Sequence, residues 1–131
     1  MIALDVNVLV RHLIRDVPGQ MPAVERLMAG LSFEDPGFVS REVQVELAWV
    51  LERLYGYDRL AIVDTFEGLL ASRELAIEAR SDVAWAIETM RERSHGFTDL
   101  MIVAASRRVG CRKLVTFDRN AARLPGAELL E

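Results

Sequence analysis

The feature that most constrains the fold of this chain is an alternation between two kinds of segment. Short runs of apolar and β-branched residues, such as MIAL at 1–4 and KLVTF at 113–117, are separated by longer segments in which apolar residues recur at helical spacing. Strands that alternate with helices in this way form βαβ units, in which helices cover both faces of a parallel sheet. The pattern therefore predicts an α/β fold, and in such folds ligands bind at the carboxyl ends of the strands.

The boundaries of the expected elements follow from the same periodicity and from turn and capping residues. Ser40 and Ser81 are the expected N-caps of two helices, and DPG at 35–37 is an expected turn. We expect strands at 1–4, 37–40, 75–78, 113–117 and 128–130, and helices at 6–15, 21–31, 41–55, 59–71, 82–93, 99–109 and 121–124.

Length and composition limit the class of protein. A chain of 131 residues is expected to form one domain. The hydrophobic share of 51% is high for a soluble domain and indicates a subunit or partner interface, although a helix-rich core alone could also account for it. The single cysteine, Cys111, fits a reducing compartment, and the N-terminus lacks the features of a signal peptide. The longest apolar run, LMIVAA at 100–105, is too short to cross a bilayer, so we expect a cytoplasmic protein without a membrane segment.

Two expected strands are each followed by an aspartate. Asp5 follows the first strand in LDVN at 4–7, and Asp118 follows a later strand in FDRN at 117–120. Apolar residues flank Asp5 so closely that we expect a partly buried carboxylate, which is costly unless it is paired, hydrogen-bonded or bound to a cation. Because parallel strands end at the same edge of a sheet, both carboxylates are expected at that edge. The alternative for each of these two aspartates is that its side chain caps a helix.

Two further acids occur in expected helices. Glu46 lies beside the apolar stripe of its helix, where charged residues are rare unless they are paired. A salt bridge to a distant arginine is the alternative explanation for Glu46. Asp99 begins an expected helix, where Thr98 or Asp99 could simply be the N-cap.

The four acids together favour a metal site. Two like charges about 5 Å apart repel by roughly 3 kcal/mol at an effective dielectric near 20, so a group of carboxylates is expected to hold a cation. Oxygen ligands without a nearby group of cysteines or histidines favour Mg²⁺ or Mn²⁺ over zinc. Such an ion suits phosphoryl chemistry, because it can activate water and neutralise charge on a scissile phosphate. The candidate ligands are Asp5, Glu46, Asp99 and Asp118.

The distribution of charge bears on a nucleic-acid partner. The net charge of −4 argues mildly against nucleic-acid binding, but residues 107–123 contain a single acid, Asp118, among their basic residues. These basic residues could form a solvated surface, but facing a carboxylate site they are better explained as a rim that contacts phosphates. His95 could also contact RNA, although a surface histidine is the simpler expectation. The predicted RNA-contacting residues are Arg107, Arg108, Arg112, Lys113, Arg119 and Arg123.

Four segments resemble the PIN-domain ribonucleases, and most of all the VapC toxins of bacterial and archaeal toxin–antitoxin pairs. They are IALDVNVLVR at 2–11, VSREVQVELAWVL at 39–51, FTDLMIVAASRRVGC at 97–111 and LVTFDRNAARLPG at 114–126. The resemblance covers residues 1–131 as a single PIN domain. It implies a three-layer α/β/α sandwich with a central parallel sheet of four to five short strands flanked by helices.

The resemblance also implies an activity and partners. The implied activity is that of a metal-dependent endoribonuclease, the toxin of a type II toxin–antitoxin system, which hydrolyses RNA phosphodiester bonds with a metal-activated water. One or two Mg²⁺ or Mn²⁺ ions are implied, and the implied products carry a 5′-phosphate and a 3′-hydroxyl. The implied partners are RNA, a VapB-like antitoxin that covers the active site, and a second copy of the chain in a homodimer.

One position departs from the pattern of that family. Val6 stands where a threonine or serine commonly follows the first aspartate, so a supporting hydroxyl is absent, which can loosen Asp5 or weaken metal binding. Asn7 and Thr116 match polar positions that support the acids. The resemblance makes Asp5, Glu46 and Asp99 the core acidic triad and Asp118 the fourth acid.

Two other functions remain open. A receiver-type phosphotransfer domain is also α/β with aspartates at strand ends, but it needs a lysine at the end of its last-but-one strand, and Lys113 stands at the start of its strand. The other is a catalytically silent PIN-like module that binds RNA or protein without cutting. The complete set of four acids argues against a silent module, whereas Val6 leaves it open.

Overall fold

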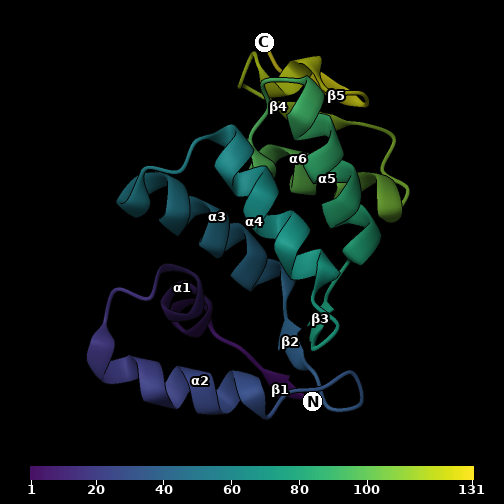
Figure 1. The fold of residues 1–131 in the computed structure, drawn as a ribbon. Helices are drawn as coiled ribbons and strands as arrows, with labels where there is room; N and C mark the ends of the chain where they lie inside the picture. The colour runs from purple at the N-terminus through teal and green to yellow at the C-terminus, as the bar shows by residue number, and fades with distance from the viewer.

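The computed structural model describes residues 1–131, in which helices and strands alternate along the chain, and this confirms the predicted α/β class (Figure 1). No helix is both long enough and apolar enough to cross a membrane. In chain order the elements are β1 (Ile2–Ala3), α1 (Val6–Ile14), η1 (Pro18–Gln20), α2 (Met21–Ala29), β2 (Gly37–Val39), α3 (Arg41–Tyr55), α4 (Arg59–Ala71), β3 (Leu75–Ile77), α5 (Arg80–Glu92), α6 (Phe97–Arg108), β4 (Leu114–Thr116), η2 (Ala121–Arg123) and β5 (Ala127–Leu129), where η denotes a 3₁₀ helix.

Every strand pair is parallel, as βαβ connections require, but the strands form two sheets. β2 lies between β1 and β3 in a three-stranded sheet, with Ile2 opposite Gly37 and Gly37 opposite Leu75. β4 pairs only with β5. Close packing favours glycine at the start of β2, because a Cβ on Gly37 would lie 2.7 Å from Cδ1 of Leu4 and the leucine side chain would have to move.

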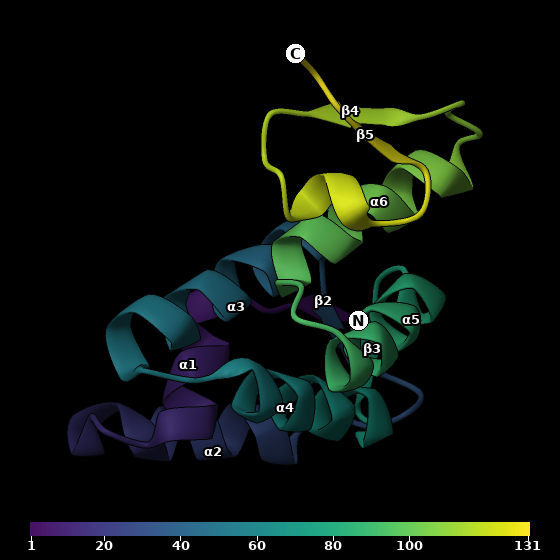
Figure 2. The same cartoon turned by 90° about the horizontal axis from the view of Figure 1, so that it is seen from above.

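The two sheets occupy different parts of the molecule. β1 lies with α1 and α2, whereas β4 and β5 lie beside α6 near the C-terminus (Figures 1 and 2). β1 contributes only two residues to its sheet and both are exposed, so its outer edge offers few backbone groups and few apolar contacts to another strand. The five short parallel strands agree with the expected fold. Their division into one sheet of three strands and one of two could not be read from the sequence pattern.

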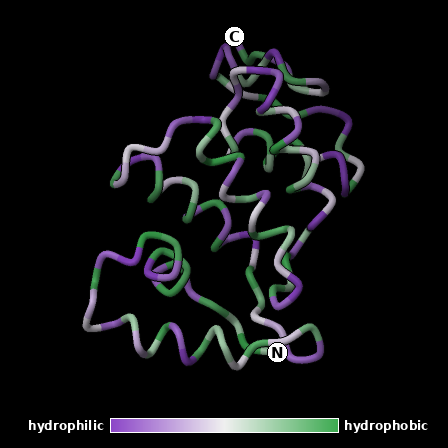
Figure 3. Tube along the Cα trace, viewed as in Figure 1, coloured by the Kyte–Doolittle hydropathy of each residue, from purple (hydrophilic) through white to green (hydrophobic).

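One hydrophobic core joins the helices to the three-stranded sheet. It comprises 23 buried residues, and fully burying each large apolar side chain contributes about 1.5–3 kcal/mol relative to exposure. Phe66 of α4 and Phe97 of α6 stack within it, with their ring centroids 4.2 Å apart. Hydrophobic and hydrophilic residues alternate along the helices (Figure 3), as helices with one buried face require.

Gln44 fixes the first turns of α3 against the sheet. Its side chain is fully buried, and Nε2 donates to the carbonyl oxygens of Val39, at 3.1 Å, and of Glu78, at 2.8 Å. Both carbonyls lie at the carboxyl ends of strands, so one amide ties α3 to the edge at which α/β folds bind ligands. Ser40 accepts a hydrogen bond from the N–H of Val43 at 3.2 Å, which confirms it as the N-cap of this helix.

Two predicted helix starts are wrong. α5 begins at Arg80 after Ala79, which has a left-handed φ of 53°, so Ser81 lies inside the helix instead of capping it. α6 begins at Phe97, two residues before the predicted start. Neither N-cap residue, Ala79 or Gly96, makes a side-chain capping hydrogen bond, so no local capping signal marks these starts.

Candidate active site

Asp99 lies in the first turn of α6 and is partly buried. The N-cap is Gly96 and no side chain caps this helix, so the interpretation of Thr98 or Asp99 as the N-cap is wrong. Burial raises the pKa of the Asp99 carboxyl, the negative charge of Asp118 raises it further, and His95 opposes both effects. The first turn of a helix favours a charged carboxylate and so lowers its pKa. At Asp99, burial and the charge of Asp118 raise the pKa by more than the helix lowers it.

Asp118 lies in the loop between β4 and η2. Its Oδ1 accepts hydrogen bonds from the backbone N–H groups of Asn120, at 2.8 Å, and Ala121, at 2.9 Å, so the side chain does make the predicted capping contact. Its own N–H donates to Oγ1 of Thr116 at 3.0 Å, which holds the loop in place. Both capping bonds use Oδ1, so Oδ2 of this exposed carboxylate stays free for a ligand.

Asp5 is the N-cap of α1, and its Oδ1 accepts a hydrogen bond from the N–H of Val6 at 2.8 Å. The side chain is exposed, so the expectation of a partly buried carboxylate is wrong. The physical reason is that Leu9 and Val10 turn into the core, whereas β1 is an edge strand with exposed residues and does not cover Asp5. Asn7 is also exposed and its side chain makes no hydrogen bond within the protein.

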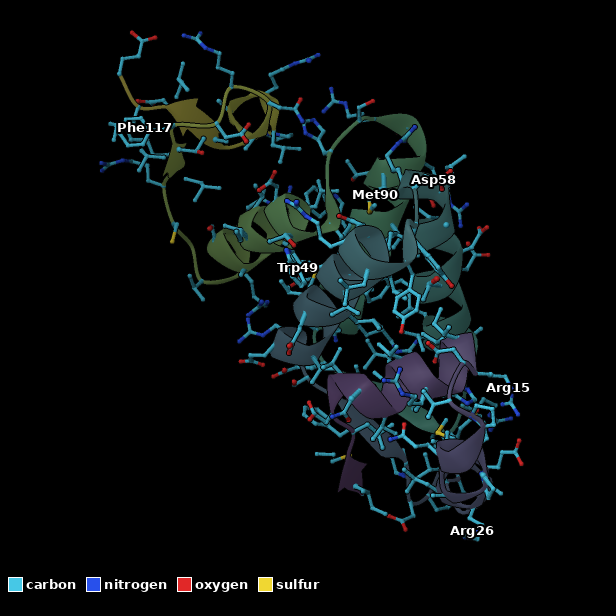
Figure 4. The ribbon with its side chains drawn as sticks, turned by 90° about the vertical axis from the view of Figure 1, so that its left-hand side faces the viewer. Arg15, Arg26, Trp49, Asp58, Met90 and Phe117 are labelled. Atoms are coloured by element: carbon cyan, nitrogen blue, oxygen red, sulfur yellow. The ribbon has the colours of Figure 1, made fainter.

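Glu46 lies on the exposed side of α3 without an ion-pair or hydrogen-bond partner, so the alternative of a salt bridge to a distant arginine is wrong. It lines a groove of about 550 Å³ between α3 and α6 together with Thr98, the residue before Asp99. The rest of the lining is mostly apolar and includes Trp49, whose side chain is 53% exposed (Figure 4). The groove therefore brings an apolar surface next to one of the candidate acids.

The structure brings two of the four predicted acids together. Asp99, from α6, and Asp118, from the loop after β4, are close enough for one carboxylate to raise the pKa of the other. Asp5 and Glu46 do not join them in a group of three or more potential metal ligands. The division of the strands accounts for this arrangement, because Asp5 follows β1 and Asp118 follows β4, which belong to different sheets.

His95 is a site residue that the sequence did not single out as buried. The expectation of a surface histidine is wrong, because its side chain is 6% exposed and its Nδ1 has no hydrogen-bond partner. Burial lowers the pKa of His95, and the charges of Arg93 and Arg123 lower it further, whereas Asp99 raises it. The one sequence signal was its place in SHGFT at 94–98, directly before the turn that carries Asp99.

Three of the six predicted RNA-contacting residues are engaged within the protein. The guanidinium carbon of Arg107 lies 4.1 Å from the ring centroid of Trp85, and Nη2 of Arg108 lies 2.8 Å from Oδ2 of Asp82. Nζ of Lys113 lies 3.0 Å from a carboxylate oxygen on β5. The residues of this set without an ion pair, a hydrogen bond or a cation–π contact are Arg112, Arg119 and Arg123.

Comparison with known proteins places this geometry in a family. The model of the PIN domain family matches residues 2–127. The chain is also similar to a VapC ribonuclease of Aquifex aeolicus (strain VF5), with 28% identity over 87 residues. That alignment covers 66% of this chain and 64% of the relative, so the chain spans somewhat less than two thirds of the protein it matches. Because the family model extends over nearly the whole α/β fold and both converging acids, this chain belongs to the PIN domain family.

Proposed function

We propose that this protein is a metal-dependent endoribonuclease that hydrolyses RNA phosphodiester bonds and acts as the toxin of a type II toxin–antitoxin system. The observation that carries the proposal is the convergence of Asp99 and Asp118 in a PIN domain, where burial and repulsion raise the pKa of Asp99. Two carboxylates that repel each other are stabilised by a cation between them. The similarity to a VapC ribonuclease supports RNA as the substrate.

The acids fit a magnesium or manganese ion. Mg²⁺ takes oxygen ligands and commonly binds through one or two carboxylates, with waters and substrate phosphates completing its coordination. Asp118 offers a free Oδ2, and the carboxylate of Asp99 makes no hydrogen bond within the protein. Asp5 also keeps one free oxygen and Glu46 has no partner, so we include both among the ligands of one or two ions.

The remaining groups of the site prepare RNA for hydrolysis. When bound, the ion supplies the hydrolytic chemistry by lowering the pKa of water and neutralising charge on the scissile phosphate. Thr116 keeps the Asp118 loop in a fixed position through the 3.0 Å hydrogen bond. Arg112 and Arg119, which have no protein partner, contact the RNA backbone. The products carry a 5′-phosphate and a 3′-hydroxyl.

The proposal includes two protein partners. The first is a VapB-like antitoxin, whose apolar segment would occupy the groove between α3 and α6. This groove is about 550 Å³ in volume, contains the exposed Trp49 and adjoins Glu46, so an occupant there covers a candidate acid. The second partner is another copy of the chain, in a homodimer. Both partners act in the cytoplasm, which is consistent with an exposed Cys111 that has no disulfide.

A cleavage assay tests the nuclease. Labelled single-stranded RNA is incubated with the protein in Mn²⁺, in Mg²⁺ or in EDTA, and the wild type is compared with Asp99→Asn. We expect cleavage only with a divalent ion and a fall of about a hundredfold or more in Asp99→Asn, because one converging ligand loses its charge. Asp64→Asn is the matched control, since Asp64 is exposed on α4 without a partner, and it should cut like the wild type.

Two outcomes contradict the nuclease. Equal cleavage by Asp99→Asn and the wild type would remove Asp99 from the site. RNA that is bound but never cut, with either metal, would instead support the catalytically silent binding module, for which the missing group of three acids and the absent hydroxyl at Val6 are the specific observations.

A further inference from the structure

A second polar site lies beside the candidate acids, where the loop between α5 and α6 meets η2. It is a pocket of about 290 Å³ without an apolar side chain in its lining. A space of this size can hold several waters, at about 30 Å³ each, or one phosphate group. The lining residues are Glu92, Arg93, Ser94, His95, Asn120 and Arg123.

The loop that forms this pocket is held from two sides. Arg59 of α4 donates through Nη1 to the carbonyl oxygens of Met90 and, at 3.0 Å, of Arg93. Asn120 donates through Nδ2 to the carbonyl oxygen of Ser94 at 3.0 Å. The pocket is therefore built between the start of α4 and the segment that follows β4, and hydrogen bonds within the protein hold its loop in place.

Three groups in the pocket have no partner within the protein. Nδ1 of His95 is buried without a hydrogen bond in a side chain that is only 6% exposed. The guanidinium groups of Arg93 and Arg123 make no ion pair and no hydrogen bond. Both lie close enough to the ring for their charges, together with burial, to lower the pKa of His95, so the imidazole is neutral near pH 7 and has one N–H to donate.

We infer that this pocket binds one phosphate of the RNA backbone, next to the phosphate that is cut. Arginines present paired N–H donors that match phosphate oxygens, and His95 adds a further donor. Glu92 is the only acid in the lining and is exposed, so the two arginines leave the pocket positive. Asp99 follows His95 by four residues and Asp118 precedes Asn120 by two residues, so an RNA strand in the pocket continues toward the acids.

This inference rests on the proposed nuclease and deepens it by naming residues that position the substrate. None of these residues is a candidate metal ligand, so the pocket can be tested without metal. His95 and His12 are the only histidines of the chain. His12 lies on α1, so its ring signals provide an internal control in the same sample.

The first measurement is nuclear magnetic resonance of isotope-labelled histidine rings in EDTA, at constant ionic strength and constant pH near neutrality. Inorganic phosphate is added to the wild type, to Arg93→Gln and to Arg123→Gln. We expect the His95 signals to move and saturate while the His12 signals stay fixed. Each arginine variant should weaken phosphate binding by about tenfold or more, because the phosphate loses a charge-assisted hydrogen bond and one positive charge.

The second measurement is RNA cleavage by the same variants in Mn²⁺. A residue that positions substrate without taking part in bond breaking should raise KM and leave kcat unchanged. Arg26→Gln is the matched control, because Arg26 is exposed on α2 at the other end of the molecule from Phe117 and the β4 region (Figure 4). It should match the wild type in both measurements.

The outcomes separate this pocket from the nuclease itself. If the His95 signals do not respond, or respond equally in the wild type and both arginine variants, the pocket is not a phosphate site even if RNA is cut. If phosphate binds and depends on both arginines but RNA is never cut in Mn²⁺, the pocket stands as an anion site and the nuclease proposal fails. Lower kcat with unchanged KM in Arg93→Gln and Arg123→Gln would also overturn the positioning role.

Discussion

At Asp99, burial and a neighbouring negative charge both favour the protonated carboxyl. The folded protein therefore keeps a proton on this group at pH values at which the unfolded chain has released it. Between the ordinary pKa of 3.8 and the raised pKa, the native state binds more protons than the unfolded state. The free energy of unfolding must fall as pH rises through this range, and the loss is complete above the raised pKa.

Asp99→Asn should remove this pH-dependent loss of stability, because asparagine carries no titratable proton. In EDTA at neutral pH we expect the variant to be more stable than the wild type by about 1 kcal/mol, because one of two like charges is gone. At a pH well below 3.8 the two proteins should be equally stable, since the carboxyl is then neutral in both states. Urea unfolding across this pH range measures the difference. Mn²⁺ should stabilise the wild type and leave Asp99→Asn nearly unchanged.

Asp64→Asn is again the control, because its carboxylate is exposed and has no partner. It should change stability little at any pH and leave the response to Mn²⁺ intact. If Asp99→Asn unfolds like the wild type in EDTA at neutral pH, then Asp99 and Asp118 do not repel each other strongly enough to form the core of a metal site.

At the scale of elements, Ser40 and Ser81 show whether a serine near a helix start stabilises the helix by capping it. Ser40 caps α3 by accepting the N–H of Val43, and this helix carries both Gln44, which binds the strand ends, and Glu46. Ser81 has the same sequence context of a serine before a helix, but it lies inside α5 and caps nothing. The two positions therefore form a matched pair.

Ser40→Ala should lower the free energy of unfolding by about 1 kcal/mol, because the first turn of α3 loses its capping acceptor. Ser81→Ala should change stability by no more than about 0.5 kcal/mol, as is usual for exposed positions without a specific contact. Thermal or urea unfolding of both variants gives the comparison, and Ser40→Thr should recover most of the loss. Equal effects of the two alanine variants would contradict the cap at Ser40.

At the scale of the whole molecule, several large apolar side chains lie on the surface and outside the core. Its hydrophobic share is 51%, and large apolar side chains such as Leu54, Leu60 and Phe117 are more than half exposed. Phe117 directly follows β4 and is 77% exposed. Exposed apolar side chains of this kind are typical of surfaces that are covered by another protein chain.

We therefore predict a homodimer, with twice the monomer mass of 14.7 kDa, at micromolar concentration. Sedimentation equilibrium measures the mass directly. The dimer should persist at high salt, because apolar contacts are not screened by ions, whereas an association through charges would weaken. A monomer at all concentrations would contradict the prediction and would assign the exposed apolar surface to the antitoxin instead.

At the same scale, the proposed binding of RNA has to be reconciled with a net charge of −4. Arg107 and Arg108 are occupied by Trp85 and Asp82 on α5, so not every arginine of the basic segment is available. What matters is that Arg93 and Arg123, whose guanidinium groups have no partner, lie close to His95, whose ring in turn lies close to Asp99. The proposed RNA binding would therefore depend on a few local charges and not on the net charge of the protein.

Features that depend on neighbours in the chain could be predicted from the sequence alone. The α/β class followed from the alternation of two periodicities, α4 runs from residue 59 to 71 as expected, and Ser40 is the predicted cap. Asp99 and Asp118 could be selected as candidates because each lies where a strand or loop turns into a helix. Local patterns were sufficient here because capping and helix amphipathicity involve residues only a few positions apart.

The tertiary structure alone decided which of these residues meet and which are buried. It placed β1, which precedes Asp5, and β4, which precedes Asp118, in different sheets, and it buried His95 between α4 and the segment after β4. It also paired Arg108 with Asp82, 26 residues away in the chain. The physical reason is that strand pairing, burial and ion pairs depend on contacts between distant segments, whose free energy is realised only when the whole chain packs.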